Sequence, residues 1–178
     1  MPDTALSELY HRIRVREAAL DRLLHCFHDL SQPRRTFQEI LEIATEAIPA
    51  DAASLFLVTA EDGTLTVVAA TGPVADKVKG MKLAPGVGMP GVIARDRRTV
   101  AVSDVTKEPS YSRERHMIAG YETTSLLAVP ILLKGDLVGV LELLNRRESH
   151  EWPRHEVELL ERIARAAGTI VTMIGERR

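Results

Sequence analysis

One cysteine and six histidines are the side chains of this sequence best suited to nucleophilic or metal chemistry. Cys26 stands alone, which excludes an internal disulfide and a cysteine-rich zinc site. His25 and His28 lie three positions apart in a segment with helical periodicity. Because the residues that flank them belong to a hydrophobic seam, we interpret the pair as the edge of that seam. The sequence therefore predicts no catalytic residue and no metal site.

A glycine-rich stretch, residues 86–91, has the spacing G-x-G-x-x-G found in loops that bind phosphate. The residues before it do not form a convincing strand, the helix expected after it is short, and Pro90 lacks a backbone N–H donor. We therefore interpret the stretch as a tight turn that opens a short helix. For residues 96–98, with sequence DRR, a solvated turn is the main interpretation and an anion-attracting rim is the alternative.

The composition narrows the classes of partner. Among 178 residues, 23 Lys and Arg against 25 Asp and Glu give a formal net charge of −2, and aromatic residues make up only 4%. Nucleic-acid binders usually carry a basic excess and rings that stack on bases, so this class is not expected. The longest apolar run, Leu126–Leu133, is shorter than the roughly 20 residues needed to cross a bilayer, and the N-terminus does not resemble a secretory signal. We predict a cytoplasmic protein without membrane insertion.

A heptad pattern runs through the first thirty residues. Only Arg16 interrupts a series of apolar side chains spaced by threes and fours: Leu6, Leu9, Ile13, Leu20, Leu23, Phe27 and Leu30. Two interpretations remain open, an amphipathic helix packed on its own domain or a coiled coil that joins two copies of the chain. Pro33 is expected to end this helix. We therefore predict a helical segment over residues 1–32 and one domain over residues 33–178.

The remaining pattern predicts hairpins that alternate with helices. Both hairpins have a glycine in the turn, and the second has strands that are apolar at nearly every position, which indicates cover on both faces. The irregular residues 82–121 are where a binding site is expected, since long connections on a rigid sheet often carry one. We predict helices at residues 36–47, 92–95 and 153–174, and strands at residues 53–59, 65–71, 100–102, 126–133 and 137–144. The last helix also has heptad-like spacing, so we expect a homodimer through the N- and C-terminal helices.

Four stretches resemble the signature of the GAF domain family: residues 103–105, 108–111, 120–131 and 135–145. The most specific is SLLAVPI at residues 125–131. Residues 83–94 also resemble the glycine-rich segment that leads into the family's short pocket helix. The similarity covers roughly residues 35–174, and the order of the elements agrees throughout.

The resemblance implies an α+β fold, with a six-stranded antiparallel sheet, terminal helices on one face, and pocket-forming loops and short helices on the other. It also implies a regulatory domain that binds a small molecule and passes the occupancy state through its end helices in signal transduction. The ligand or cofactor is unknown from the sequence. The alternative is a ligand-free dimerisation or protein-interaction module of a larger signalling protein. The expected pocket residues are Phe56, Val92, Tyr111, His116, Tyr121 and Thr123.

Four further positions, Asn145, Arg146, Trp152 and Glu156, correspond to a set that cyclic-nucleotide-binding members carry near the last strand and helix. Arg146 replaces a Lys of that set, Trp152 a Phe and Glu156 an Asp. We interpret all four as structural residues that hold the chain between the last strand and the last helix. A carboxylate at position 156 also suits the positive end of a helix dipole.

Other differences between this sequence and known members of the family reduce the number of ligand classes to consider. His116 and Ala119 stand where cyclic-nucleotide-binding members often have Asp and Thr, which counts against such a ligand. His116 is interpreted as a solvent-facing lid residue, with an anion contact as the alternative. The family's methionine-sulfoxide reductases need several cysteines, and covalent bilins need one beside the pocket. Cys26 meets neither requirement.

Overall fold

A six-stranded antiparallel sheet forms the centre of the computed structural model, which describes residues 4–28, 30–108, 117–118 and 120–176. The strand order is β3-β2-β1-β8-β7-β4. The six strands are β1 Ala50–Val58, β2 Leu65–Thr71, β3 Lys82–Leu83, β4 Val100–Val102, β7 Leu126–Leu133 and β8 Asp136–Arg146. A separate antiparallel pair joins β5 Met117–Ile118 to β6 Tyr121–Glu122. The predicted α+β class and six-stranded antiparallel sheet are confirmed.

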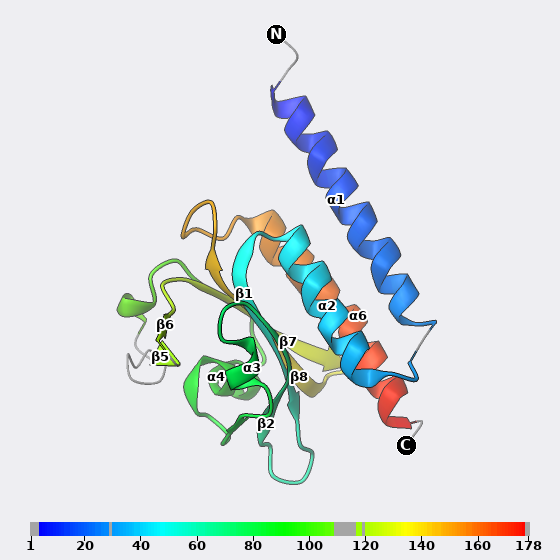
Figure 1. The fold of residues 1–178 in the computed structure, drawn as a ribbon, viewed down its shortest axis with the longest axis vertical. Helices are drawn as coiled ribbons and strands as arrows, with labels where there is room; N and C mark the ends of the chain where they lie inside the picture. Colours follow the sequence, from blue (N-terminus) through cyan, green and yellow to red (C-terminus); the bar gives the residue numbers. More distant parts are fainter. Residues whose placement is uncertain (1–3, 29, 109–116, 119, 177–178) are drawn as a thin grey trace.

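Helices cover both faces of the sheet (Figure 1). The long helices share one face: α1 Thr4–Cys26, α2 Pro33–Ala47 and α6 Arg154–Glu176. The other face carries the short elements: α3 Ala75–Val78, α4 Gly88–Asp96 and the 3-10 turn η1 Val105–Lys107. Within the described residues, no helix is both long and apolar enough to span a bilayer.

The sheet separates two hydrophobic clusters. Successive side chains of a strand point to opposite faces, so Leu141 and Leu143 of β8 pack against the long helices while Val140 packs beneath the short ones. The apolar face of α6 is used within its own domain, since Leu160, Ile163 and other residues of that helix belong to the first cluster. The C-terminal helix therefore offers no continuous free seam among its described residues.

Pro33 has a different role from the expected one. Helix α1 ends at Cys26, and Pro33 lies in the first turn of α2. Proline suits this position because the first N–H groups of a helix have no intrahelical acceptor. The expectation that Pro33 ends the first helix is therefore wrong, and α2 begins earlier than predicted.

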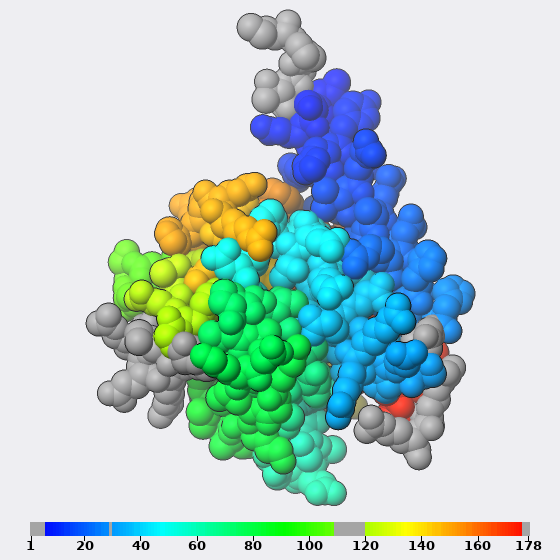
Figure 2. Space-filling model, in the orientation of Figure 1, coloured from blue at the N-terminus to red at the C-terminus, as the bar shows by residue number. Residues whose placement is uncertain are grey.

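Helix α1 divides its apolar residues between two directions. Ala19, Leu23 and Cys26 are buried against the body of the domain, and an ion pair joins Arg22 to Glu46 of α2. Six large apolar side chains of this helix are 42–61% exposed: Leu6, Leu9, Tyr10, Ile13, Leu20 and Leu24, here called the α1 stripe. The N-terminal half of the helix projects beyond the body of the domain (Figure 2).

Helix α6 lies close to the sheet because Gly168 has no side chain. A Cβ at this position would lie 2.9 Å from the carbonyl oxygen of Leu132 in β7. Gly175, on the same helix, has no atom within 4 Å of an equivalent Cβ. Replacing Gly168 therefore tests close packing against the sheet, and replacing Gly175 tests helix propensity alone.

We expect Gly168→Ala to lower the free energy of unfolding by about 1–3 kcal/mol, because the helix must move away from the sheet. Gly175→Ala should leave it unchanged or raise it by up to about 1 kcal/mol, since alanine favours helix. Urea unfolding monitored by circular dichroism measures both. Equal effects of the two substitutions would contradict the close approach at Gly168.

Candidate ligand-binding cavity

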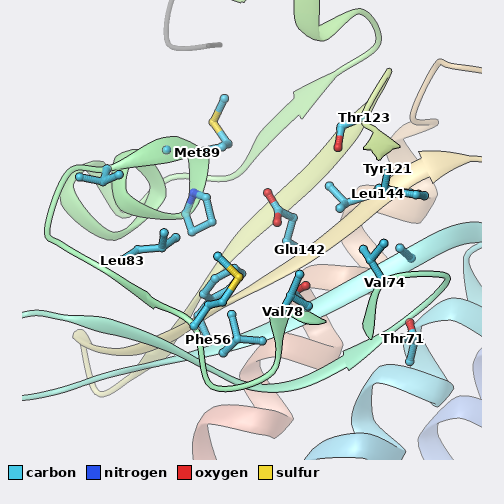
Figure 3. A pocket seen from close by; sticks show the side chains of 17 residues that line it. Phe56, Thr71, Val74, Val78, Leu83, Met89, Tyr121, Thr123, Glu142 and Leu144 are labelled. Carbon is cyan, nitrogen blue, oxygen red and sulfur yellow. The ribbon is translucent and has the colours of Figure 1, made fainter. Parts of the chain in front are cut away.

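A cavity of about 370 Å³ lies between the sheet and the short helices (Figure 3). This volume falls within the range of about 300–1,000 Å³ that is usual for small-molecule sites. Most of the lining is apolar, with a few hydroxyl groups and one carboxyl group. The described lining residues are Ala52, Ser54, Phe56, Val67, Thr71, Val74, Val78, Met81, Leu83, Val87, Gly88, Met89, Pro90, Tyr121, Thr123, Glu142 and Leu144.

The floor of the cavity is hollow because one row of the sheet carries small side chains. Strand register places Ala70, Ser54, Glu142 and Ala128 side by side across β2, β1, β8 and β7. Residues in such a row share a face of the sheet, with Cβ atoms of directly paired residues about 4.5–5.5 Å apart. Glu142 thus stands between small neighbours, and the space above them is left unfilled.

Glu142 is the one carboxylic acid among the described lining residues. Its side chain extends from β8 into the space below α4 (Figure 3), and the residue is only 7% exposed. No other described residue forms a hydrogen bond or an ion pair with it. Burial raises the pKa of Glu142 from its ordinary value of 4.5 to about 7, because the charged form is poorly solvated there.

Tyr121 adds a hydroxyl group to the wall, and Thr71 borders the cavity at the end of β2. Thr71 pairs with Ala53, whose side chain packs beneath the long helices, so its buried hydroxyl, which has no hydrogen-bond partner among the described residues, belongs to that face of the sheet. The Tyr121 hydroxyl accepts a hydrogen bond of 3.1 Å from Nδ2 of Asn145, which leaves its own proton available to an acceptor. Burial, reinforced by the charge of Asp51, raises the pKa of Tyr121 to about 12, so the phenol stays protonated.

Asn145 positions the residues at the edge of the cavity. It is the second-last residue of β8 and has a left-handed backbone, φ 55°. Its Oδ1 accepts from the backbone N–H of Thr124 at 2.7 Å, and its Nδ2 donates to the carbonyl of Glu122 at 2.8 Å as well as to Tyr121. One side-chain amide therefore holds the segment that carries Tyr121 and Thr123 against the end of β8.

Arg146 and Glu156 connect the end of β8 to the start of α6. Both side chains are less than 10% exposed, and two hydrogen bonds join them, Nε to Oε2 at 2.7 Å and Nη2 to Oε1 at 2.8 Å. This paired geometry fixes orientation as well as distance. Trp152 lies between the two elements in sequence, and its Nε1 donates to the carbonyl of Val102 at 3.3 Å.

Three of the six expected pocket residues, Phe56, Tyr121 and Thr123, line the cavity. Val92 packs against the hydrophobic cluster beneath the short helices and is not among the lining residues; α4 presents Met89 and Pro90 instead. The expected roles of Tyr111 and His116 concern residues outside those that the structure describes.

Glu142 and Thr71 were not expected from the sequence. The available signal was a single charged residue inside the apolar strand run LVGVLELL. A carboxylate in a strand covered on both faces must reach a cavity, water or a partner. Thr71 gives no such signal, because threonine is common in strands.

The thiol of Cys26 lies on the opposite side of the sheet from the cavity. Cys26 belongs to the cluster beneath the long helices, and burial raises its pKa to about 11. Within the described part of the chain, no three His, Cys, Asp or Glu side chains are grouped to hold a metal ion. The chemistry of the cavity therefore comes from its carboxyl and hydroxyl groups.

Solved structures share this fold. A GAF domain from a phosphoenolpyruvate-protein phosphotransferase of Coxiella burnetii superposes with a TM-score of 0.77 at 22% identity, covering 91% of this chain and 97% of that one. A free methionine-R-sulfoxide reductase of Neisseria meningitidis, solved with its substrate, gives 0.69 at 18% identity, covering 100% of this chain and 96% of that one.

Sequence relatives extend the comparison. A dual 3',5'-cyclic-AMP and -GMP phosphodiesterase 11A of Takifugu rubripes is 29% identical over 161 residues, which are 84% of this chain and 18% of that protein. The chain thus spans about a fifth of the length of the curated relatives it matches. The family model described as GAF domain matches residues 32–171. The chain therefore belongs to the GAF domain family.

Proposed function

We propose that this domain is a regulatory sensor that binds a small molecule in the cavity between the sheet and α3 and α4. The observation that carries the proposal is an apolar cavity that contains the buried carboxyl group of Glu142, which has no partner among the described residues. Buried polar groups in native proteins are nearly always paired. A ligand that supplies the missing partner accounts for this group.

The same carboxyl group lowers the stability of the unliganded protein. A buried polar group without a partner costs about 1–3 kcal/mol, and a charged group costs more. Proteins tolerate such costs at sites where activity requires them. In this proposal, the ligand recovers part of that free energy when it binds.

Occupancy reaches the long helices through the sheet. Glu142 faces the cavity, while its neighbours Leu141 and Leu143 pack in the cluster that includes α6. The end of the same strand is fixed to the start of α6 by the Arg146–Glu156 pair. A ligand changes the arrangement of the helices only if it binds one arrangement more tightly than the other.

The curated relatives bear on the choice of ligand. Their names describe cyclic phosphodiesterases, and this chain matches a limited part of each. A cyclic nucleotide carries a phosphate anion, which Glu142 would repel in its ionised form, above about pH 7, if the two were close. We therefore propose a regulatory domain of a larger signalling protein whose ligand differs from a cyclic nucleotide.

A second proposed function, homodimerisation, is favoured by the α1 stripe. Leu6, Ile13 and Leu20 are spaced by seven residues, and all three are exposed on a helix that projects from the domain. A second copy of the chain would present the same stripe, so two copies are self-complementary about a two-fold axis. We propose that α1 supplies the dimer seam.

The pKa of Glu142 gives a pH dependence of stability. In the folded protein the carboxyl stays protonated up to about pH 7, whereas an exposed Glu loses its proton near 4.5. The folded state therefore binds more protons between these values, and stability falls as the pH rises through them, in total on the order of 3 kcal/mol. Glu142→Gln should flatten this decline, as measured by urea unfolding across the range. Glu61→Gln, in an exposed turn, is the control, and a decline that persists in Glu142→Gln would contradict the assignment.

Ligand binding is tested by thermal shift with cyclic nucleotides, nucleotides, 2-oxo acids, amino acids and amines. We expect at least one compound to raise the melting temperature of the wild-type protein. Ser54→Leu, which fills the floor of the cavity, should remove the shift, while the exposed Ser103→Leu should keep it. Circular dichroism checks that both variants fold. Failure of every compound, or a shift that survives Ser54→Leu, would reject the cavity as the site.

Association through α1 is tested by sedimentation. Ile13→Glu combined with Leu20→Glu should weaken dimerisation by about tenfold or more, since two charges enter the apolar seam. Ala18→Glu, exposed on another side of the helix, should have little effect. A monomeric wild-type protein at high concentration would disprove the dimer.

A further inference from the structure

We propose that the ligand presents an N–H donor group, cationic or neutral, to Glu142 and buries an apolar body against Phe56 and the first turn of α4. This inference rests on the proposed function and specifies its ligand class. Three observations support it: the hydrogen-bonding capacity of Glu142, the charge of the lining and the shape of the apolar wall.

The Glu142 carboxyl group has unused hydrogen-bonding capacity. An ionised carboxylate has two oxygens that accept and no proton to donate, so its natural partners are N–H and O–H groups. The residue is 7% exposed and points into the cavity (Figure 3), which leaves bulk water a small part in its solvation. Its partners in the neighbouring strands are Ser54 and Ala128, and neither supplies a charge.

The described part of the lining contains no cation to balance the carboxylate. Among the described residues around the cavity, none is Lys, Arg or His, and the one other titratable side chain is Tyr121. Its pKa of about 12 keeps it neutral. A ligand with a cationic nitrogen would therefore supply the missing counter-charge in a site of low polarity, where such a pairing is stronger than in water. A carboxylate or phosphate ligand at the same place would add a second anion.

The rest of the cavity suits an apolar body. Phe56, Val67, Val78 and Met89 contribute aliphatic or aromatic surface to its wall. The methionine and the ring are side chains that pack well against flat groups. The ligand class is thus an apolar small molecule with an amine, amidine or amide nitrogen.

The test uses three molecules of nearly the same shape: benzamidine, benzamide and benzoate. Their head groups are a cation with two N–H donors, a neutral donor and acceptor, and an anion without donors. At about pH 8, where Glu142 is mostly ionised, we expect benzamidine to bind the wild-type protein about tenfold or more tightly than benzoate. NMR titration of the backbone amides, up to about 10 mM of each compound, covers the weak affinities of molecules this small.

Glu142→Gln should weaken benzamidine about tenfold or more and change benzamide by less than about threefold. Glu61→Gln should leave all three affinities unchanged. A second measurement needs no variant: the affinity of the wild-type protein for benzamidine should rise with pH around 7, as Glu142 ionises while the amidine stays cationic. This result would stand even if Glu142→Gln did not fold.

Three outcomes would overturn the inference: benzoate binding as well as benzamidine, an amidine preference that survives Glu142→Gln, or no binding of any of the three compounds. The proposed function is judged separately. If benzoate or another anion binds and Ser54→Leu abolishes that binding, the cavity is a ligand site and the inferred ligand class is wrong. If no compound of the broader panel binds, the sensor function itself fails.

Discussion

Strand β8 serves two layers at once, because successive side chains along a strand point to opposite faces of the sheet. Leu141 and Leu143 contribute to the cluster beneath the long helices, and Glu142 between them enters the cavity. A shift of register by one residue would exchange these roles and bury the carboxylate among α2 and α6. The register is therefore the constraint on which both the core and the site depend. Asn145 supports it at the end of the strand, where its side chain binds the chain that enters β7.

The two faces of the sheet differ in how completely they are filled. Long helices place leucine and isoleucine against one face, where Ile131 and Leu141 are fully buried. On the other face, short helices lie over a row whose members, apart from Glu142, are no larger than serine. The long-helix face holds most of the described buried hydrophobic residues. The cavity face can therefore hold an unfilled volume and a buried carboxyl group within a folded domain.

Sequence periodicity was sufficient for much of the fold, since every long element has a regular apolar pattern. Strands β2, β4 and β7 begin and end where that pattern predicts. It could not separate the end of one helix from the start of the next at Pro33, because proline is compatible with both. It could not show which turn of α4 faces the cavity, where Met89 and Pro90 line the wall in place of the expected Val92. Nor could it identify Glu142 as a site residue, because the size of its neighbours on β1 and β7 appears only once the strands are paired.

The separation of the hydrophobic residues into two clusters also bears on how such a domain diversifies. Substitutions in the row beneath α4 alter the volume and polarity of the cavity, while Leu160, Ile163 and the other contacts under the long helices stay as they are. The effects of substitutions on the free energy of unfolding are close to additive when the sites are distant and share no partners. A substitution in one cluster therefore leaves the contribution of the other cluster to stability nearly unchanged. Natural variation can therefore explore new ligands on one side of the sheet while the opposite side preserves a foldable scaffold.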